Sequence, residues 1–251
     1  MNAKIFFTIG LLLSVVMVSQ AQEHRNHKAD SLAFQAEQYE ADNNFEQAKE
    51  LYLQAAKLGQ AIAMLNLGTL YMEEQKPESY AQAMHWYIQA AHQGNIIAMG
   101  NIGRMYYAGQ GVSTDKAKAA KWFLVAAEKG HIRSMYNLAV CYEDGDGFNQ
   151  DLDKAIYWYE QAAEQNSSSA LLNLGFIYAS GHIPDYTKAL GYWKQSAELG
   201  NEVAMFNLGR AYELGLGIDK NITTAKDWYR KAADVDYAQA ATALKRLETT
   251  K

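Results

Sequence analysis

The residues most suggestive of catalysis form a Ser-Thr-Asp-Lys tetrad at positions 113–116. Penicillin-recognising enzymes use a Ser and a Lys at this spacing, and the Lys activates the Ser as a nucleophile. Those enzymes also need an S-D-N and a K-T-G element, and this sequence has neither. The sequence also lacks the G-x-S-x-G, H-E-x-x-H and P-loop motifs. We therefore predict no catalytic residues.

Two groups of residues contain metal-ligating side chains, and neither makes a complete site. The run Glu-Asp-Gly-Asp-Gly at 143–147 suggests a calcium loop. Counted from Asp144, however, it lacks the ligand and the Gly that an EF-hand has at its fifth and sixth positions. His24 and His27 supply two ligands without a third. A weak surface cation site at 143–147 is the alternative to a solvated turn, and we predict no metal and no cofactor.

Composition narrows the classes of protein to which the chain can belong. Of its 251 residues, 49% are apolar and 20% are charged, as in globular proteins. A single Cys excludes an intramolecular disulfide framework and any multi-Cys zinc site. The formal net charge of -5 gives no electrostatic reason to bind nucleic acid or an anionic membrane.

The first 21 residues are typical of a secretory signal peptide. Lys4 is followed by an apolar run at 5–18, and small residues precede a cleavage site between Ala21 and Gln22. A run of 14 residues is short for a membrane-spanning helix, which needs about 20. We predict export to the periplasm or outside a bacterial cell, with no stable membrane insertion after cleavage and a flexible linker at 22–30. A retained anchor is the alternative.

Internal repeats define the elements that must position any functional residue. Five segments align: AMLNLGTLY at 63–71, AMGNIGRMY at 98–106, SMYNLAVCY at 134–142, ALLNLGFIY at 170–178 and AMFNLGRAY at 204–212. Their shared Asn recurs at intervals of 35, 36, 36 and 34 residues. Each segment is followed by a second one of the type AMHWYIQAAHQG, which starts at Ala83 in the first copy. A fixed period of this length is typical of a helical repeat array.

Each half of a repeat predicts one helix. Apolar residues recur at spacings of three and four, and the Gly or Ala after the Leu allows a neighbouring helix to approach closely. Six polar residues, each four positions before the Ala that opens a second half, are good N-caps. They are Asn44, Ser79, Asp115, Asp151, Asp185 and Asn221. Gly-x-Gly turns or a Pro separate the halves.

The repeated pattern A-x-x-x-L-G-x-x-Y, followed by K-A-x-x-W-Y-x-x-A-A-x-x-G, resembles the Sel-one-like repeat (SLR) family, a relative of the tetratricopeptide repeats. The resemblance implies an all-α fold, an α/α superhelical solenoid of helix-turn-helix repeats with a concave and a convex side. We predict a tetratricopeptide-like helix pair at 31–59, five SEL-like repeats within 61–236 and a C-terminal capping helix at 238–249. The five repeats are 61–95, 96–131, 132–166, 168–200 and 202–236.

The resemblance also implies a function, that of a non-catalytic scaffold whose partner is a protein or peptide. One exported subgroup with Cys pairs in each repeat is linked to penicillin binding and β-lactamase activity, and this chain lacks those pairs. Such an activity and cell-wall glycan binding are the alternatives. Cys141 aligns with apolar residues in the other copies, so we predict a buried structural thiol. We assign Trp86, Trp122, Trp158 and Trp228 to the core between helices.

The recurring Asn is the best candidate for ligand binding. The series is Asn66, Asn101, Asn137, Asn173 and Asn207. A row of amides along a concave wall can bond the backbone of an extended peptide, whatever its sequence. Alternatively, each amide bonds a neighbouring helix or turn. Residues at helical spacing from the Asn would set specificity, and three Arg near aromatic rings suit a peptide with carboxylate and apolar groups. They are Ile97, Arg104, Arg133, Tyr136, Phe176, Phe206 and Arg210.

Overall fold

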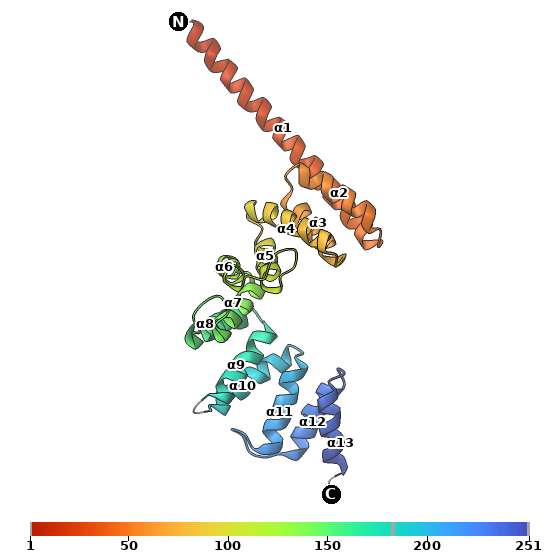
Figure 1. Cartoon of the computed structure of the whole chain (residues 1–251), viewed down its shortest axis with the longest axis vertical. Coiled ribbons are helices and arrows are strands. Elements are labelled where there is room, and N and C mark those ends of the chain that lie inside the picture. Colours follow the sequence, from red (N-terminus) through yellow and green to blue (C-terminus); the bar gives the residue numbers. More distant parts are fainter. Residues whose placement is uncertain (1, 182–183, 250–251) are drawn as a thin grey trace. The chain divides into compact units, whose positions relative to one another are not determined.

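The computed structural model describes residues 2–181 and 184–249, with side chains described from residue 19 onward, and this part of the chain is helical with no strand (Figure 1). The helices are α1 (Asn2–Ala41), α2 (Phe45–Lys57), α3 (Ala61–Glu73), α4 (Pro77–His92), α5 (Ile96–Ala108), α6 (Lys116–Glu128), α7 (Ile132–Asp144), α8 (Leu152–Ala163), α9 (Ser168–Ser180), α10 (Tyr186–Glu198), α11 (Glu202–Leu214), α12 (Ile222–Ala233) and α13 (Ala238–Thr249).

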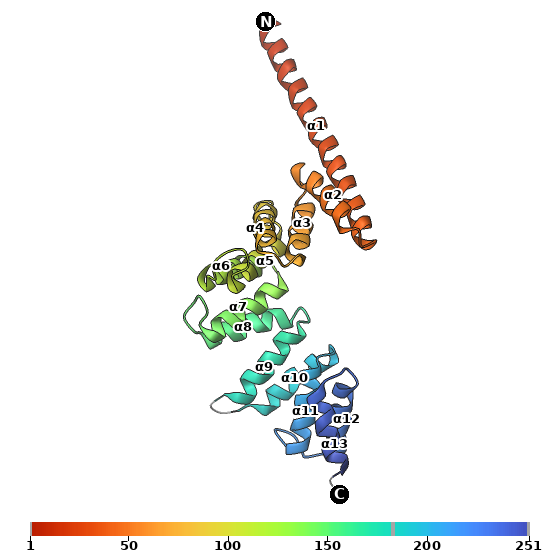
Figure 2. The same cartoon turned by 45° about the vertical axis from the view of Figure 1, so that its right-hand side comes forward.

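The chain forms two compact units, Met1–Trp122 and Phe123–Lys251. In the first unit α1 packs on α2 and α3 on α4, and α2 and α4 also contact the helix that follows them. In the second unit the pairs are α7 with α8, α9 with α10 and α11 with α12, and α13 packs on α12 (Figure 2). Consecutive helix pairs joined by short turns confirm the predicted fold class, an all-α array of helix-turn-helix repeats.

Five of the six predicted N-caps are confirmed. The side chains of Asn44, Asp115, Asp151, Asp185 and Asn221 each accept a hydrogen bond from the backbone N–H three residues later. The prediction for Ser79 is wrong, because Pro77 opens α4 two residues earlier and a Pro suits the first position of a helix. Ser79 is buried and donates instead to the carboxylate of Glu74 at 2.6 Å.

The capping Asp also explains why a Tyr and a Lys recur around the turn within a repeat. Asp151 donates its backbone N–H to the carbonyl of Tyr142, and its carboxylate lies 2.7 Å from the Lys154 ammonium. That ammonium lies 5.3 Å from the centre of the Tyr142 ring. Hydrogen bonds from Lys154 lower the pKa of Asp151. The same contacts join the corresponding residues of two other copies, Tyr106, Asp115 and Lys118, and Tyr178, Asp185 and Lys188.

Close approach at the Gly after the Leu is confirmed. A Cβ at Gly68 would lie 2.7 Å from the ring of Tyr87, and Gly209 stands in the same way against Tyr229. The aromatic residue that fills this space is the second of each aromatic pair, whereas Trp86 and its counterparts are half-buried. These Trp side chains therefore lie at the margin of the core rather than in its centre, and Trp228 packs against a buried cluster of α10 and α11. Adjacent helical residues point about 100° apart, so one of the two can face the first helix.

The predicted flexible linker at 22–30 is helical, as part of α1. Residues 22–41 contain no Gly or Pro, and Ala29, Ala33 and Ala36 are buried in the first unit. Side chains of the predicted signal segment up to residue 18 lie outside the described residues, so the signal peptide stays a prediction. In the part that is described, no helix combines the length and the apolar character needed to cross a membrane. Cys141 is buried, as predicted.

Candidate functional site

The recurring Asn side chains bond a Tyr of the preceding helix where one is present. Asn66 donates to the Tyr52 hydroxyl at 3.2 Å in the first unit, and Asn173 donates to the Tyr159 hydroxyl at 2.8 Å in the second. Asn101 and Tyr87 form the corresponding pair in the next copy. Burial raises the pKa of Tyr87, and the hydrogen bond with Asn101 acts in the opposite direction. In each of these pairs the Tyr precedes the Asn by 14 residues.

The two remaining Asn face aromatic residues without a hydroxyl. Phe123 precedes Asn137 by 14 residues, and Trp193 precedes Asn207 by the same interval. Asn207 is buried and donates to the backbone carbonyl of Val203 in its own helix, at 2.8 Å. The amides of Asn66, Asn101 and Asn173 therefore join neighbouring helices, which supports the structural alternative for these three copies, whereas Asn207 bonds its own helix. Binding of a peptide by these amides stays untested.

A carboxylate accepts a hydrogen bond from the Tyr hydroxyl in three copies. Tyr52 donates to Glu40, Tyr159 to Glu143 and Tyr229 to Glu213, each at 2.7 Å. Burial and the nearby carboxylate raise the pKa of all three hydroxyls. Glu143 thus belongs to this interaction and Asp151 to a cap, which leaves the acidic turn no complete ligand set. The described residues hold no cluster of three or more metal-ligating side chains, and His24 and His27 are exposed on α1.

Two residues of the Ser-x-x-Lys tetrad make structural contacts in this turn. Asp115 caps α6, and the Lys116 ammonium lies over the ring of Tyr107, 5.5 Å from its centre. The tetrad is therefore explained by the turn between α5 and α6.

Three predicted groove residues each contact a buried aromatic ring in the second unit. Tyr136 lies 5.7 Å from Tyr159, Phe176 lies 5.8 Å from Trp193 and Phe206 lies 5.5 Å from Tyr229, measured between ring centres. Each contact joins a partly accessible ring to a buried one, and Phe176 is 41% exposed. Arg133 and Arg210 are exposed on helices of the same unit. Ile97 and Arg104 are exposed in the first unit.

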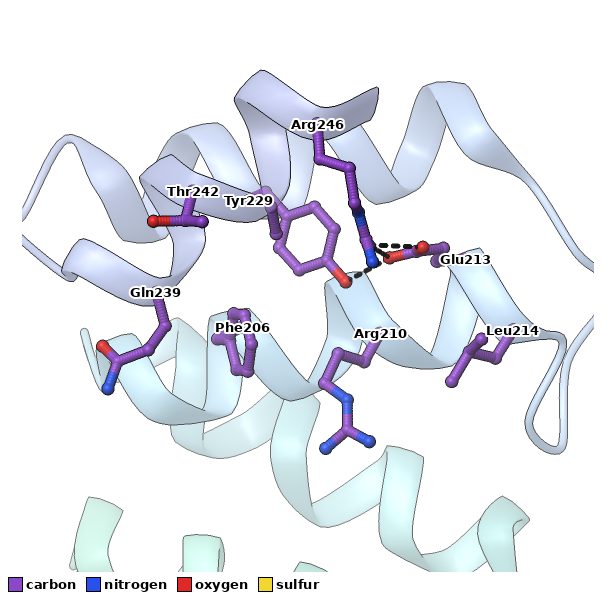
Figure 3. A pocket seen from close by; sticks show the side chains of 9 residues that line it. Phe206, Arg210, Glu213, Leu214, Tyr229, Gln239, Thr242 and Arg246 are labelled. Atoms are coloured by element: carbon purple, nitrogen blue, oxygen red, sulfur yellow. Dashed lines mark hydrogen bonds and ion pairs between the residues drawn. The ribbon is translucent and has the colours of Figure 1, made fainter. Parts of the chain in front are cut away.

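A pocket of about 350 Å³ lies between α11, α12 and α13 (Figure 3). It contains two of the predicted groove residues, Phe206 and Arg210, and the buried ring of Tyr229. The rest of its wall was not predicted as a binding site. These residues are Glu213, Leu214, Gln239, Thr242, Ala243 and Arg246.

The two Arg residues of the pocket differ in how they are used. One guanidinium nitrogen of Arg246 donates to both oxygens of Glu213, at 2.5 and 2.7 Å. Glu213 also accepts a hydrogen bond from the Tyr229 hydroxyl, so its carboxylate is paired with both residues. Arg210 points away from Glu213 and makes no hydrogen bond or ion pair with the described residues (Figure 3). The pocket therefore carries one uncompensated positive charge.

A sequence signal for the missed residues exists in the repeat frame. Ala240 of α13 aligns with Ala204 of α11, which places Arg246 at the position of Arg210 and Ala243 at that of Asn207. The sequence prediction placed α13 outside the repeats, as a capping helix, and so did not include Arg246 among the binding residues.

A family model for the Sel1 repeat matches residues 36–60, 61–95, 96–131, 132–167, 168–201 and 203–237. The chain belongs to the Sel1 repeat family. The first match shows that the helix pair at the start, which the sequence separated from the SEL-like copies, is a Sel1 repeat as well. Sel1 repeat proteins are generally scaffolds for protein interaction and typically have no catalytic activity.

Solved structures of the family resemble this Sel1 protein. A Sel1 repeat protein from Oxalobacter formigenes is 29% identical with a TM-score of 0.76, and the match covers 83% of this chain and 86% of that one. The protein c5321, a protective antigen of uropathogenic Escherichia coli, is 27% identical with a TM-score of 0.61, covering 86% and 56%. A Sel1 repeat protein from Klebsiella pneumoniae shares the fold at 24% identity and a TM-score of 0.53, covering 80% and 99%. None of the curated proteins matches the chain.

Proposed function

We propose that this Sel1 protein is an exported, non-catalytic scaffold that binds a protein or peptide partner through its second unit. The surface that we assign to the partner consists of Tyr136, Phe176, Phe206 and Arg210, and is called the aromatic face below. Aromatic and Arg side chains contribute strongly at protein interfaces because they bury a large area and donate several hydrogen bonds.

The observation that carries this proposal is the pocket beside Phe206. Its Arg210 is not needed to balance a charge in the fold, and the aromatic ring beside it is accessible. An exposed Arg alone is ordinary in a folded chain, and what points to a ligand is the pocket that joins this Arg to an aromatic ring. A partner that supplies an apolar side chain and a negative charge fits these two groups.

Partner capture tests the interaction. The tagged chain, expressed in its own host, would be cross-linked and purified, and the captured proteins identified by mass spectrometry. The double variant Phe206→Ala with Arg210→Ala should lose the captured partner. A matched double variant on the second helices, Tyr157→Ala with Lys194→Ala, also removes an exposed ring and an exposed cation and should retain it. Equal capture by both variants contradicts the assignment of the aromatic face.

Cell fractionation tests the proposed export. A C-terminally tagged chain should be found outside the cytoplasm with Gln22 as its first residue, as read by N-terminal sequencing. Recovery of the uncleaved chain in the membrane fraction would support the retained anchor instead.

A further inference from the structure

The pocket between α11 and α13 differs from the other copies at one position. In the copies with a Tyr, the Asn that follows 14 residues later donates its amide to the Tyr hydroxyl, as Asn66 and Asn173 do. Fourteen residues after Tyr229 stands Ala243. A methyl group thus replaces an amide, and the lone pair of the Tyr229 hydroxyl receives no hydrogen bond from the described residues. The space that the amide would fill belongs to the pocket.

The charges of the pocket favour an anion. Glu213 is neutralised by Arg246 and by the Tyr229 hydroxyl, whereas Arg210 is unpaired. Exposed Gln239 adds an amide on α13, opposite Arg210 and Phe206 of α11, whereas the Thr242 hydroxyl donates to the Ala238 carbonyl of its own helix (Figure 3). A guanidinium matches a carboxylate in geometry, because two parallel N–H groups can donate to its two oxygens.

We propose that this pocket binds a carboxylate of a peptide partner, with Arg210 as the anion-binding residue and Phe206 as the contact for an adjacent apolar group. The proposal rests on the proposed function, since it names the chemistry that the second unit selects. A volume of about 350 Å³ accommodates one or two residues of a peptide. The carboxylate belongs either to the C-terminus of the peptide or to an acidic side chain of it. In both cases the same chemical group lies beside Arg210.

Small probes separate these sources. The exported chain, labelled with ¹⁵N, would be titrated with N-acetylphenylalanine, N-acetylphenylalaninamide and N-acetylglutamic acid α-amide, and amide shifts of Gln239, Thr242 and Arg210 followed by NMR. Binding of N-acetylphenylalanine about tenfold tighter than its amide supports a terminal carboxylate. Preference for the glutamic acid probe supports an acidic side chain. Equal shifts with all three probes overturn the proposal.

Two variants test the residues. Arg210→Gln should lower the affinity for the carboxylate probe at least about tenfold, because it removes the unpaired charge and keeps a polar side chain. Ala243→Asn should block the pocket, because it restores the amide that faces a Tyr in other copies. The variant should fold, since Asn stands at this repeat position in those copies. Lys194→Gln, which removes an exposed cation on α10 outside the pocket, is the control. Full binding by Arg210→Gln contradicts the proposal.

The outcomes separate this inference from the proposed function. If the carboxylate probes fail but partner capture still depends on Phe206, the chain is an interaction scaffold whose pocket does not select an anion. If the probes bind and capture does not depend on the aromatic face, the pocket binds an anion and the proposed partner surface is wrong.

Discussion

At the scale of single residues, the aromatic residue 14 positions earlier decides what a recurring Asn does. A Tyr offers its hydroxyl as an acceptor, as Tyr159 does for Asn173, whereas Phe123 offers none to Asn137. A Trp can donate but cannot accept, and the Nε1 of Trp193 is the buried polar atom that lacks a partner in the described part of the chain. The Asn207 amide turns to the backbone of its own helix instead.

This rule predicts unequal effects for the same substitution at two positions. Asn173→Ala should lower the free energy of unfolding by about 1–2 kcal/mol, because it leaves the hydroxyl of the buried Tyr159 without its donor. Asn137→Ala should cost less than about 0.5 kcal/mol, since its side chain has no hydroxyl to bond. Urea denaturation followed by circular dichroism measures both. Equal losses would show that the bond to Tyr159 adds nothing to stability.

The sequence could predict the Asn series as a repeated feature but could not choose between its two uses. The choice depends on whether a Tyr hydroxyl lies within reach, and reach follows from how α8 packs on α9 rather than from the Asn itself. The pocket was missed for a related reason. Its distinguishing residue is Ala243, an unremarkable Ala whose meaning appears when α13 is aligned with the other first helices.

At the scale of elements, a Gly inside a helix can be required by packing or can simply cost stability, and two neighbouring helices show the two cases. Gly175 of α9 lies under the ring of Trp193, so a Cβ there would overlap the indole. Gly191 lies in the middle of α10, and a Cβ there would meet no atom within 4 Å. A Gly inside a helix costs stability relative to Ala, because it loses more conformational freedom on folding.

Substitution by Ala should therefore shift stability in opposite directions. Gly191→Ala should stabilise the second unit by about 0.5–1 kcal/mol through its helix propensity. Gly175→Ala should destabilise it by about 1–3 kcal/mol, because the buried indole must move. Thermal unfolding of the two variants side by side provides the measurement. A gain in stability from Gly175→Ala would show that the ring is not held against this helix.

Helix bounds were predictable where the local chemistry repeats. The capping Asp or Asn, the Gly that ends most of the second helices and the apolar spacing all act within a few residues, so the sequence displays them directly. Predictions failed where one residue changed the local rule. Pro77 moved the start of α4 ahead of Ser79, and the absence of Gly and Pro from 22–41 let α1 continue through the predicted linker.

At the scale of the whole molecule, both units contain Tyr side chains that are buried or, in the case of Tyr192, half-buried. Burial is the largest cause that raises the pKa of Tyr192, from 10.0 to about 12, and the carboxylate of Glu160 adds to it. The same causes, with other partners, raise the pKa of Tyr52, Tyr87, Tyr159 and Tyr229. A repeat protein sums such contributions copy by copy.

These shifts predict a loss of stability in alkali. Between pH 10 and 12 the folded chain keeps Tyr protons that the unfolded chain releases, so the unfolding free energy is unaffected below pH 10 and falls as the pH rises through the folded values. Tyrosinate absorbance and circular dichroism, recorded together from pH 9 to 12.5, should show ionisation of these hydroxyls coinciding with unfolding. Tyr159→Phe should reduce the pH dependence, whereas Tyr157→Phe, at an exposed ring, should leave it unchanged. Ionisation of every Tyr near pH 10 in a chain that stays folded would contradict the role assigned to the hydroxyl contacts.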